Sequence, residues 1–311
     1  MTAASHPPTA PFSSVWSALP PEYAIPEHAP SEAEAREYCR RLARSHYENF
    51  SVASWFLPEH LRLHFFDVYA YCRISDDLGD EVGDGAASLQ LLEQWETELN
   101  ACYEGHPRHP VFVALAETVR KFEIPKHEFS DLLTAFRQDQ TVTRYETFND
   151  LLGYCRYSAN PVGHLVLYLC GYRDSERQLL SDYTCTALQL ANFWQDVSVD
   201  FAKGRIYLPL EDLRRFGVNQ EVIRDGENTS AFREMMRFEV ARAREWFQQG
   251  MPLIAKVDRA LAIDIELFSR GGQEILNAIE RQHYAVLGRR PAISKTRKLV
   301  LVARAALGRL R

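Results

Sequence analysis

The sequence predicts a single all-α domain, and two features of the residue pattern support that prediction. Apolar residues recur at the three- and four-residue spacing of a helix face over residues 61–72, 179–199, 232–247 and 261–287. Alternating strand-like runs with hairpin signals are missing, and short groups rich in Gly or Pro separate the periodic stretches. A chain of 311 residues with 46% hydrophobic residues is also long enough to bury one large core.

The two ends of the chain differ in composition from the part between them. Residues 1–30 are rich in Pro, Ala and Ser, and we expect them to be disordered. Ser31 followed by Glu32 and Glu34 is typical of a helix start, so we place the helical domain at residues 31–290. Residues 291–311 form a basic C-terminal tail.

This tail contrasts with the net charge of −6 of the whole chain. No acid follows Glu280, whereas nine basic residues do, and they alternate with Leu, Val and Ala. The tail could therefore lie on an anionic membrane surface. A last helix docked on the domain, with a solvated basic face, explains the pattern equally well. Because the rest of the chain is acidic, we expect no nucleic-acid partner.

The remaining bulk features favour the cytoplasm. The six cysteines form no CxxC pair and no metal-type spacing, which is typical of buried thiols in a reducing compartment. The N-terminus lacks the basic and continuous apolar regions of a signal peptide, and no stretch approaches the roughly 18 apolar residues of a membrane span. We expect a cytoplasmic protein, with peripheral attachment to the inner membrane if the tail binds lipid.

Acidic residues gather directly after the apolar stretch 61–72, in RISDDLGDE at residues 73–81. Asp76 and Asp80 are four residues apart and so lie on one face of a helix. Like charges at this spacing repel each other unless a cation lies between them, and Mg²⁺ prefers such oxygen ligands. We expect Asp77 and Glu81 to face solvent or to pair with nearby cations. A single pair of this kind is expected by chance in a chain of this length.

A second acidic stretch, NFWQDVSVD at residues 192–200, makes chance a weaker explanation. Asn192, Asp196 and Asp200 also recur at four-residue spacing, so they present oxygen atoms on one helix face while the other faces are apolar. Two such faces predict antiparallel helices that hold a metal-bridged diphosphate between them.

Basic residues accompany both acidic stretches. Arg73 lies three residues before Asp76, and Lys203 and Arg205 follow Asp200 around Gly204, where the backbone can turn back toward a ligand. These cations either bind the diphosphate or pair with the acids. In both cases they reduce the negative charge of the site.

The stretch YAYCRISDDLGD at residues 69–80, together with the pattern from Asn192 through Asp196, Asp200 and Arg205-Ile-Tyr207-Leu-Pro209, resembles the squalene/phytoene synthase family of head-to-head prenyl synthases. The resemblance covers about residues 36–290. It implies an isoprenoid-synthase helical bundle with a central cavity, a prenyl diphosphate substrate, and Mg²⁺, with Mn²⁺ as an alternative. The metal ligands that it implies are Asp76, Asp80, Asn192, Asp196 and Asp200. Tyr69, Arg73, Lys203, Arg205 and Tyr207 are then expected close to the diphosphate.

The implied chemistry agrees with these residue types. Metal ions neutralise a leaving diphosphate and promote ionisation to a carbocation, which aromatic side chains such as Phe50 and Phe193 would stabilise in a dry cavity. Core packing explains such aromatic residues as well. We expect no nicotinamide cofactor, since no GxGxxG stretch follows a predicted strand.

One segment departs from the family pattern. Where many members have a segment containing Ser and Lys, this chain reads HYENFSVAS at residues 46–54, with Glu48 and Asn49 in place of a diphosphate-binding lysine. With SANPVG at residues 158–163, the chain looks most like the bacterial hydroxysqualene synthases of hopanoid biosynthesis. This implies that presqualene diphosphate is ionised, rearranged and captured by water. Glu48, Asn49, Tyr69 or Asn160 could orient that water.

Two alternative functions remain open. The first is head-to-head condensation of two prenyl diphosphates to presqualene diphosphate, squalene, dehydrosqualene or phytoene. The second is a non-catalytic homologue that assembles neighbouring enzymes of the pathway. A scaffold gains nothing from two unneutralised acidic faces, so the sequence favours an enzyme.

Overall fold

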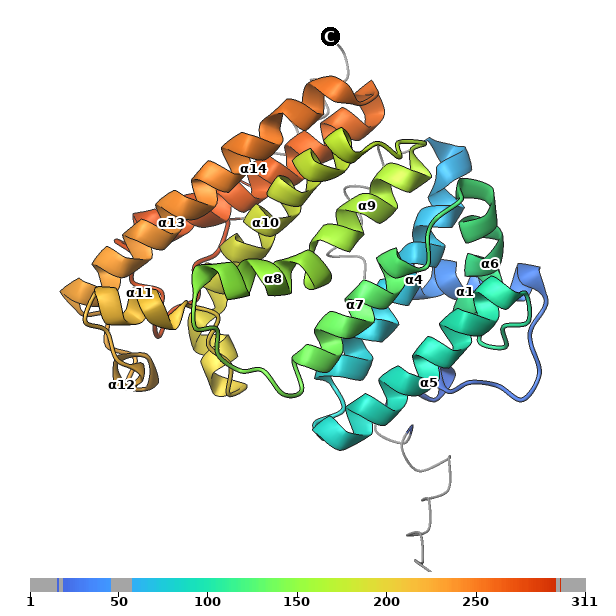
Figure 1. Cartoon of the computed structure of the whole chain (residues 1–311), viewed down its shortest axis with the longest axis horizontal. Helices are drawn as coiled ribbons and strands as arrows, with labels where there is room; N and C mark the ends of the chain where they lie inside the picture. The colour runs from blue at the N-terminus through green and yellow to red at the C-terminus, as the bar shows by residue number, and fades with distance from the viewer. Residues whose placement is uncertain (1–15, 17–18, 46–57, 295–296, 298–311) are drawn as a thin grey trace, which may run out of the picture.

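The computed structural model describes residues 16, 19–45, 58–294 and 297, and helices dominate this part of the chain (Figure 1). Within these residues, the single β-type contact is an isolated bridge between Arg144 and Ile206. The prediction of one all-α domain is confirmed.

The helices run in two groups along the chain. The first group is η2 (Pro21–Tyr23), α1 (Glu32–Ser45), α4 (Glu59–Asp80), α5 (Gly85–Glu104), α6 (Pro110–Phe122) and α7 (His127–Gln138). The second group is α8 (Phe148–Ser158), α9 (Asn160–Leu169), α10 (Ser175–Ala202), α11 (Leu210–Arg215), α12 (Gln220–Arg224), α13 (Ser230–Gly250), η3 (Met251–Lys256) and α14 (Arg259–Arg281). Figure 1 shows α10, α13 and α14 side by side, with α8 and α9 between them and the first group.

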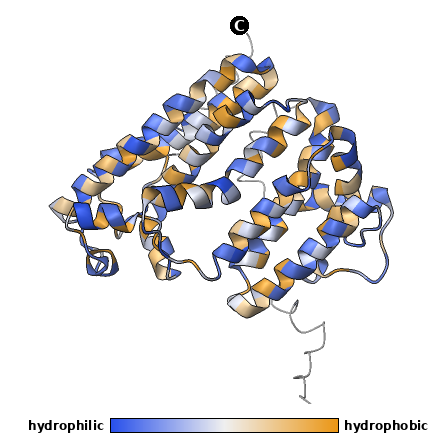
Figure 2. Ribbon diagram, in the orientation of Figure 1, coloured by the Kyte–Doolittle hydropathy of each residue, from blue (hydrophilic) through white to orange (hydrophobic). Residues whose placement is uncertain are grey.

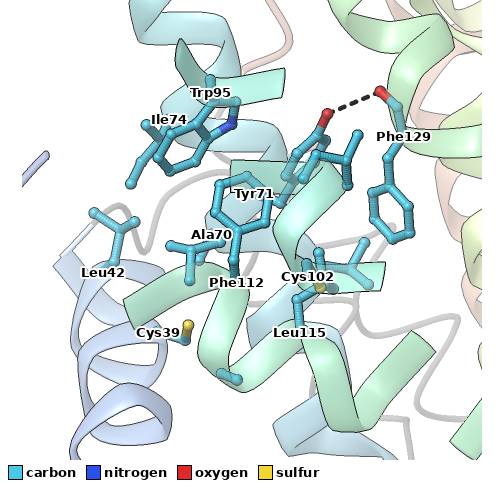
Figure 3. Packing of buried hydrophobic residues seen from close by; sticks show 14 of the residues in the cluster. Cys39, Leu42, Ala70, Tyr71, Ile74, Trp95, Cys102, Phe112, Leu115 and Phe129 are labelled. Carbon is cyan, nitrogen blue, oxygen red and sulfur yellow. Dashed lines mark hydrogen bonds between the residues drawn. The ribbon is translucent and has the colours of Figure 1, made fainter. Parts of the chain in front are cut away.

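Helix α4 is at the centre of the first hydrophobic cluster. Its Tyr71 is fully buried against Trp95, Phe112 and Phe129, and the Tyr71 hydroxyl donates to the backbone oxygen of Phe129 at 2.8 Å (Figure 3). Most helices are amphipathic, with hydrophilic and hydrophobic residues alternating along each ribbon (Figure 2). Burial of these aromatic rings fixes the position of α4, since each buries a large apolar area.

Helix α10 is at the centre of the second cluster, and glycine lets its neighbours approach it closely. A Cβ atom at Gly272 of α14 would lie 2.8 Å from Leu188 of α10 and 2.4 Å from Phe247. A Cβ atom at Gly163 of α9 would lie 2.2 Å from the Oγ of Ser181 on α10. Both helices can therefore pack at these distances only because glycine has no side chain.

The N-terminal segment is more ordered than expected. Tyr23 is only 3% exposed, and its hydroxyl donates to Asp77 of α4 at 2.7 Å, while the Trp16 indole donates to Gln94 at 3.0 Å. The expectation of disorder over residues 1–30 therefore does not hold for residues 19–30, because aromatic side chains anchor this proline-rich segment. Residues 1–15 and 17–18 lie outside the described residues.

The first residues of the C-terminal tail contact the domain. The backbone oxygen of Pro291 accepts a hydrogen bond from Gln195 at 2.6 Å, and Arg297 pairs with Glu274 at 2.8 Å. Most of the tail lies outside the described residues, so its proposed contact with a membrane is untested. None of the helices described here is both long and apolar enough to cross a bilayer.

His164 joins three helices near the centre of the molecule. Its ring nitrogens lie 3.0 Å from Glu128 of α7 and 2.7 Å from Asp182 of α10. Burial alone favours the neutral ring, but the hydrogen bonds and charges of Asp182 and Glu128 outweigh it and raise the pKa of His164 to about 9.

We expect this interaction to make stability depend on pH. Because the pKa of His164 is higher in the folded than in the unfolded chain, its contribution is fully present below about pH 6.5 and is lost as the pH rises through about 9. The free energy of unfolding should fall by about 1–2 kcal/mol more in the wild type than in His164→Gln between about pH 7 and about pH 10. Urea unfolding of both proteins measures this. Equal decreases would contradict the assignment.

Candidate active site

Two contiguous pockets lie along α4 and α10. An apolar cavity of about 410 Å³ lies between α4, α9, α10 and α14. A polar pocket of about 400 Å³ lies near the C-terminal ends of α4 and α10. Tyr69, Cys72 and Val162 line both pockets, so an apolar ligand tail in the cavity could be continuous with a charged head in the polar pocket.

The two helices run in the same direction, so the prediction of antiparallel helices was wrong. Phe65 of α4 and Cys185 of α10 line the apolar cavity, while Asp80 and Asp200 line the polar pocket. Each helix therefore passes from the cavity to the pocket in its N- to C-terminal direction. Spacing within each acidic stretch shows which residues share a face, but it carries no information on helix direction.

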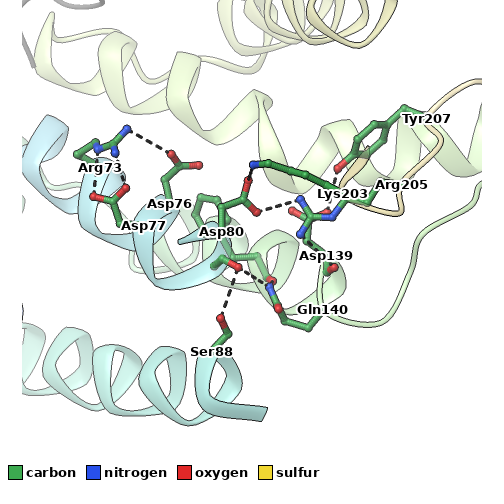
Figure 4. Close-up of polar contacts among 12 residues, drawn as sticks. Arg73, Asp76, Asp77, Asp80, Ser88, Asp139, Gln140, Lys203, Arg205 and Tyr207 are labelled. Carbon is green, nitrogen blue, oxygen red and sulfur yellow. Dashed lines mark hydrogen bonds and ion pairs between the residues drawn. The ribbon is translucent and has the colours of Figure 1, made fainter. Parts of the chain in front are cut away.

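The first acidic stretch brings three aspartates to the end of α4 (Figure 4). Arg73 pairs with Asp77 through two nitrogens and lies 3.7 Å from Asp76. Asp77 is only 5% exposed and also accepts the Tyr23 hydroxyl, so it is the aspartate that holds Arg73 in place. Of the two outcomes expected for Asp77, pairing with a cation is the one observed.

The turn after α10 supplies two cations to Asp80. Lys203 Nζ lies 3.1 Å from one carboxylate oxygen of Asp80, and Arg205 Nη1 lies 2.9 Å from the other. Figure 4 shows both side chains reaching from the turn after α10 to Asp80. The sequence-predicted basic residues therefore do meet the first acidic stretch, 123 and 125 residues away in the chain.

The second acidic stretch lies on the last turns of α10. Asn192 and Asp200 line the polar pocket. Asp196 pairs with Arg290 through both of its oxygens, one of them at 3.0 Å, and Arg290 also donates to Gln195 at 3.2 Å. Arg290 belongs to the segment after α14, and no sequence pattern indicates that it approaches Asp196, since 94 residues separate them.

The charges in the pocket shift the pKa values of its aspartates. Desolvation at the pocket wall, and then the charge of Asp80, raise the pKa of Asp76 to about 6. Burial, and then the charge of Asp196, raise the pKa of Asp200 to about 7. Burial also favours a higher pKa for Asp80. The charges and hydrogen bonds of Arg205 and Lys203 outweigh this effect and lower the pKa of the Asp80 carboxyl.

An aromatic wall flanks the acidic groups. The rings of Phe193 and Tyr207 stack with their centroids 3.9 Å apart, and Tyr154 lies 5.7 Å from Tyr207 and 6.1 Å from Phe193. All three line the polar pocket. Aromatic faces attract cations, so this wall can stabilise positive charge that develops next to the carboxylates.

The structure groups most of the predicted site residues and leaves some untested. Those that line the polar pocket are Tyr69, Arg73, Asp76, Asp80, Asn192, Asp200, Arg205 and Tyr207. Lys203 joins them through its ion pair with Asp80, whereas Asp196 does not line the pocket and pairs with Arg290. Asn49 and Phe50, like Glu48, lie outside the described residues. Asn160 accepts a hydrogen bond from Thr186 at 3.0 Å.

Two residues of the site, Tyr154 and Arg290, are not indicated by the sequence. The stretch Arg137-Gln138-Asp139 indicates either another polar contact or a buried ion pair, so Asp139 is not among the predicted catalytic residues. Tyr154 and Asp139 lie in periodic or turn segments whose residue types give no distinctive spacing. Only the fold brings them next to the acidic stretches.

The chemistry of the donor set fits a hard divalent cation. Carboxylate and amide oxygens line one pocket, where desolvation and then the charge of a neighbouring aspartate raise the pKa of Asp76 and of Asp200. No group of three or more His, Cys, Asp or Glu side chains suited to a metal ion occurs within the part of the chain that the structure covers. Magnesium commonly binds through one or two carboxylates together with substrate phosphate oxygens.

Crowding of the acidic groups predicts an unusual effect of Asp200→Asn. Because the pKa of Asp200 is higher in the folded than in the unfolded chain, its ionisation costs stability, and this cost grows as the pH rises from about 4 to about 7. Without metal, the variant should melt about 2–4 °C above the wild type at about pH 8, and the difference should vanish near pH 4. Calorimetry in a chelating buffer measures this. A variant less stable than the wild type at both pH values would contradict the prediction.

Comparison with known proteins agrees with this geometry. The family model described as squalene/phytoene synthase matches residues 43–297. The crystal structure of squalene synthase HpnC from Alicyclobacillus acidocaldarius is 45% identical, with a TM-score of 0.78, over 87% of this chain and 98% of that one. The crystal structure of a dehydrosqualene synthase in complex with ligand is 27% identical, with a TM-score of 0.80, over 89% of this chain and 96% of that one.

A curated relative gives the same result. The 15-cis-phytoene synthase of Synechocystis sp. is 30% identical over 282 residues, which are 87% of this chain and 84% of that protein. The matched range contains both acidic stretches, the basic turn and Arg290. The chain therefore belongs to the squalene/phytoene synthase family and has the isoprenoid-synthase fold.

Proposed function

We propose that this chain converts presqualene diphosphate into hydroxysqualene by loss of diphosphate, rearrangement of the carbocation and capture by water. The observation that carries the proposal is that Tyr69, Cys72 and Val162 line both the polar pocket and the apolar cavity. A substrate with one diphosphate and long hydrocarbon chains needs both environments side by side. The 45% identity to the squalene synthase HpnC supports the choice among the reactions of the family.

The polar pocket binds the diphosphate in this proposal. Arg73 and Arg205 line this pocket, and Lys203 and Arg290 pair with Asp80 and Asp196. Each of these four cations can exchange an aspartate partner for a phosphate oxygen. Mg²⁺ would be held by Asp76 and Asp80 from α4 and by Asn192, Asp196 and Asp200 from α10. When bound, Mg²⁺ neutralises the leaving diphosphate and so promotes ionisation.

The walls of the site protect the carbocation. Phe193, Tyr154 and Tyr207 present aromatic faces beside the point where the diphosphate leaves. The cavity holds the hydrocarbon of the substrate against apolar side chains such as Phe65, Leu188 and Leu261. These side chains exclude water from most of the hydrocarbon. This reaction needs no nicotinamide, because no reduction occurs in it.

Head-to-head condensation of two prenyl diphosphates is the second candidate. The similarity to a phytoene synthase and to a dehydrosqualene synthase favours it. Purified protein with Mg²⁺ can be incubated separately with farnesyl diphosphate, geranylgeranyl diphosphate and presqualene diphosphate, and the products identified by mass spectrometry. Hydroxysqualene from presqualene diphosphate supports the proposal. Consumption of farnesyl or geranylgeranyl diphosphate, with presqualene diphosphate left unchanged, would refute it in favour of condensation.

Substitution of the acidic groups separates an enzyme from a scaffold. Asp76→Ala and Asp196→Ala should each lower turnover about a thousandfold or more, because one side of the site can no longer bind metal and diphosphate together. Both variants should keep the melting temperature of the wild type or exceed it without Mg²⁺. Glu81→Ala, which removes an exposed acid of the same stretch, is the matched control and should stay within about twofold of wild-type turnover. Wild-type turnover in both aspartate variants would refute the site.

A further inference from the structure

Asp139 is a buried carboxylate that the steps above do not use. It directly follows α7, lines the polar pocket and is only 7% exposed. Figure 4 shows it beside Arg205 and Tyr207, on the side of the pocket away from Arg73 and Asp77. A carboxylate in such a position costs free energy unless hydrogen-bond donors compensate it, so its partners indicate what it is for.

Three donors surround Asp139. The Tyr154 hydroxyl donates to one carboxylate oxygen at 2.8 Å, and the Tyr207 hydroxyl donates to the other at 3.4 Å. Arg205, which also pairs with Asp80, donates to the backbone oxygen of Asp139 at 3.3 Å. The residue therefore links two tyrosines of the aromatic wall to the basic turn that follows α10.

These bonds fix the direction in which both tyrosines donate. A tyrosine hydroxyl has one hydrogen and two lone pairs. Since the hydrogens of Tyr154 and Tyr207 are directed to Asp139, a molecule that reaches either oxygen from the pocket meets only lone pairs. Burial, and then the charge of Asp139, hold the pKa of Tyr154 well above its ordinary value, so the hydroxyl keeps its hydrogen at neutral pH.

Such an acceptor distinguishes between the possible occupants of the pocket. A diphosphate offers acceptor oxygens and gains nothing from a tyrosine that cannot donate. A water molecule can donate a hydrogen to the tyrosine oxygen, which leaves its own lone pair free for a neighbouring carbocation. The stacked rings of Phe193 and Tyr207 lie at the same wall and would favour the cation there.

We propose that Asp139 is a positioning residue that makes Tyr154, with Tyr207, the acceptor for the water that captures the carbocation. This inference rests on the proposed conversion of presqualene diphosphate. In the capture step the water oxygen forms the carbon–oxygen bond with one lone pair. The resulting oxonium passes one proton to the Tyr154 oxygen, while the proton of Tyr154 moves to Asp139. Asp139 then releases that proton to the departing diphosphate or to solvent.

Asp139→Asn tests this role because the amide donates a hydrogen where the carboxylate only accepts. At least one tyrosine hydroxyl must then turn its hydrogen elsewhere, and the acceptor in the pocket is lost. With presqualene diphosphate and Mg²⁺, we expect the rate of diphosphate release to stay within about threefold of the wild type. The share of hydroxysqualene among the products should fall about tenfold in favour of unrearranged alcohols and elimination products.

Two further variants distinguish positioning from simple support of the fold. Tyr154→Phe should change the product shares in the same direction, and the double variant should be no worse than Tyr154→Phe alone, because Asp139 acts through Tyr154. It also supplies the test if Asp139→Asn does not fold. Asp67→Asn is the matched control, since Asp67 is 1% exposed, accepts the Thr118 hydroxyl at 2.7 Å and lines neither pocket. It should keep the wild-type product shares.

Each outcome has a definite meaning. Wild-type product shares in folded Asp139→Asn or Tyr154→Phe, measured beside a wild type that forms hydroxysqualene, would overturn the role of Asp139 alone. A shift of equal size in Asp67→Asn would also overturn it, because the effect would then come from loss of stability. A wild type that forms no hydroxysqualene from presqualene diphosphate would refute the proposed function, and this inference with it.

Discussion

The structure depends on how it compensates negative charge at the ends of two helices. Helices α4 and α10 run in the same direction and both end at the polar pocket, with their aspartates in the last turns. The C-terminal end of a helix carries partial negative charge, so these carboxylates are placed where the helix dipoles oppose them. Desolvation, and then the charge of the neighbouring aspartate, raise the pKa of Asp76 and of Asp200 as well. Such an arrangement is favourable only with cations present.

The chain supplies part of that compensation itself. Lys203 and Arg205 pair with Asp80, and Arg290 pairs with Asp196, from segments far from those aspartates in the sequence. The same cations are suited to phosphate oxygens. When substrate and metal bind, the cations would therefore pair with the diphosphate and the aspartates would bind the metal. The apolar cavity begins where this charge ends, at Tyr69 and Cys72, because the earlier turns of α4 carry Phe65 and Val68 there. Helix α10 adds Leu188 and small side chains to the same wall. The order of residues along α4 and α10 therefore gives the site a charged pocket at one end and an apolar cavity at the other.

The sequence predicted correctly those features that depend only on residues close together in the chain. Four-residue spacing placed Asp76 with Asp80 and Asn192 with Asp196 and Asp200, because the geometry of one helix is enough for that. It predicted the wrong relative direction of α4 and α10, since direction depends on the segments between them. It missed the contact of Arg290 with Asp196 and the grouping of Asp139 with Tyr154 and Tyr207, which arise only when distant segments pack together. The hydrogen bond from Tyr23 to Asp77 was not predicted for the same reason, since the two residues are 54 positions apart.

We propose that the two acidic helix ends bind divalent cations together with a diphosphate. The most direct measurement is thermal unfolding of the wild type with Mg²⁺ alone, inorganic diphosphate alone, and both together. The two ligands together should raise the melting temperature by much more than the sum of their separate effects, because each removes repulsion that the other would meet. If diphosphate stabilised the protein equally with Mg²⁺ and with a chelator, the basic residues alone would hold the diphosphate, and joint binding with a divalent cation would be contradicted.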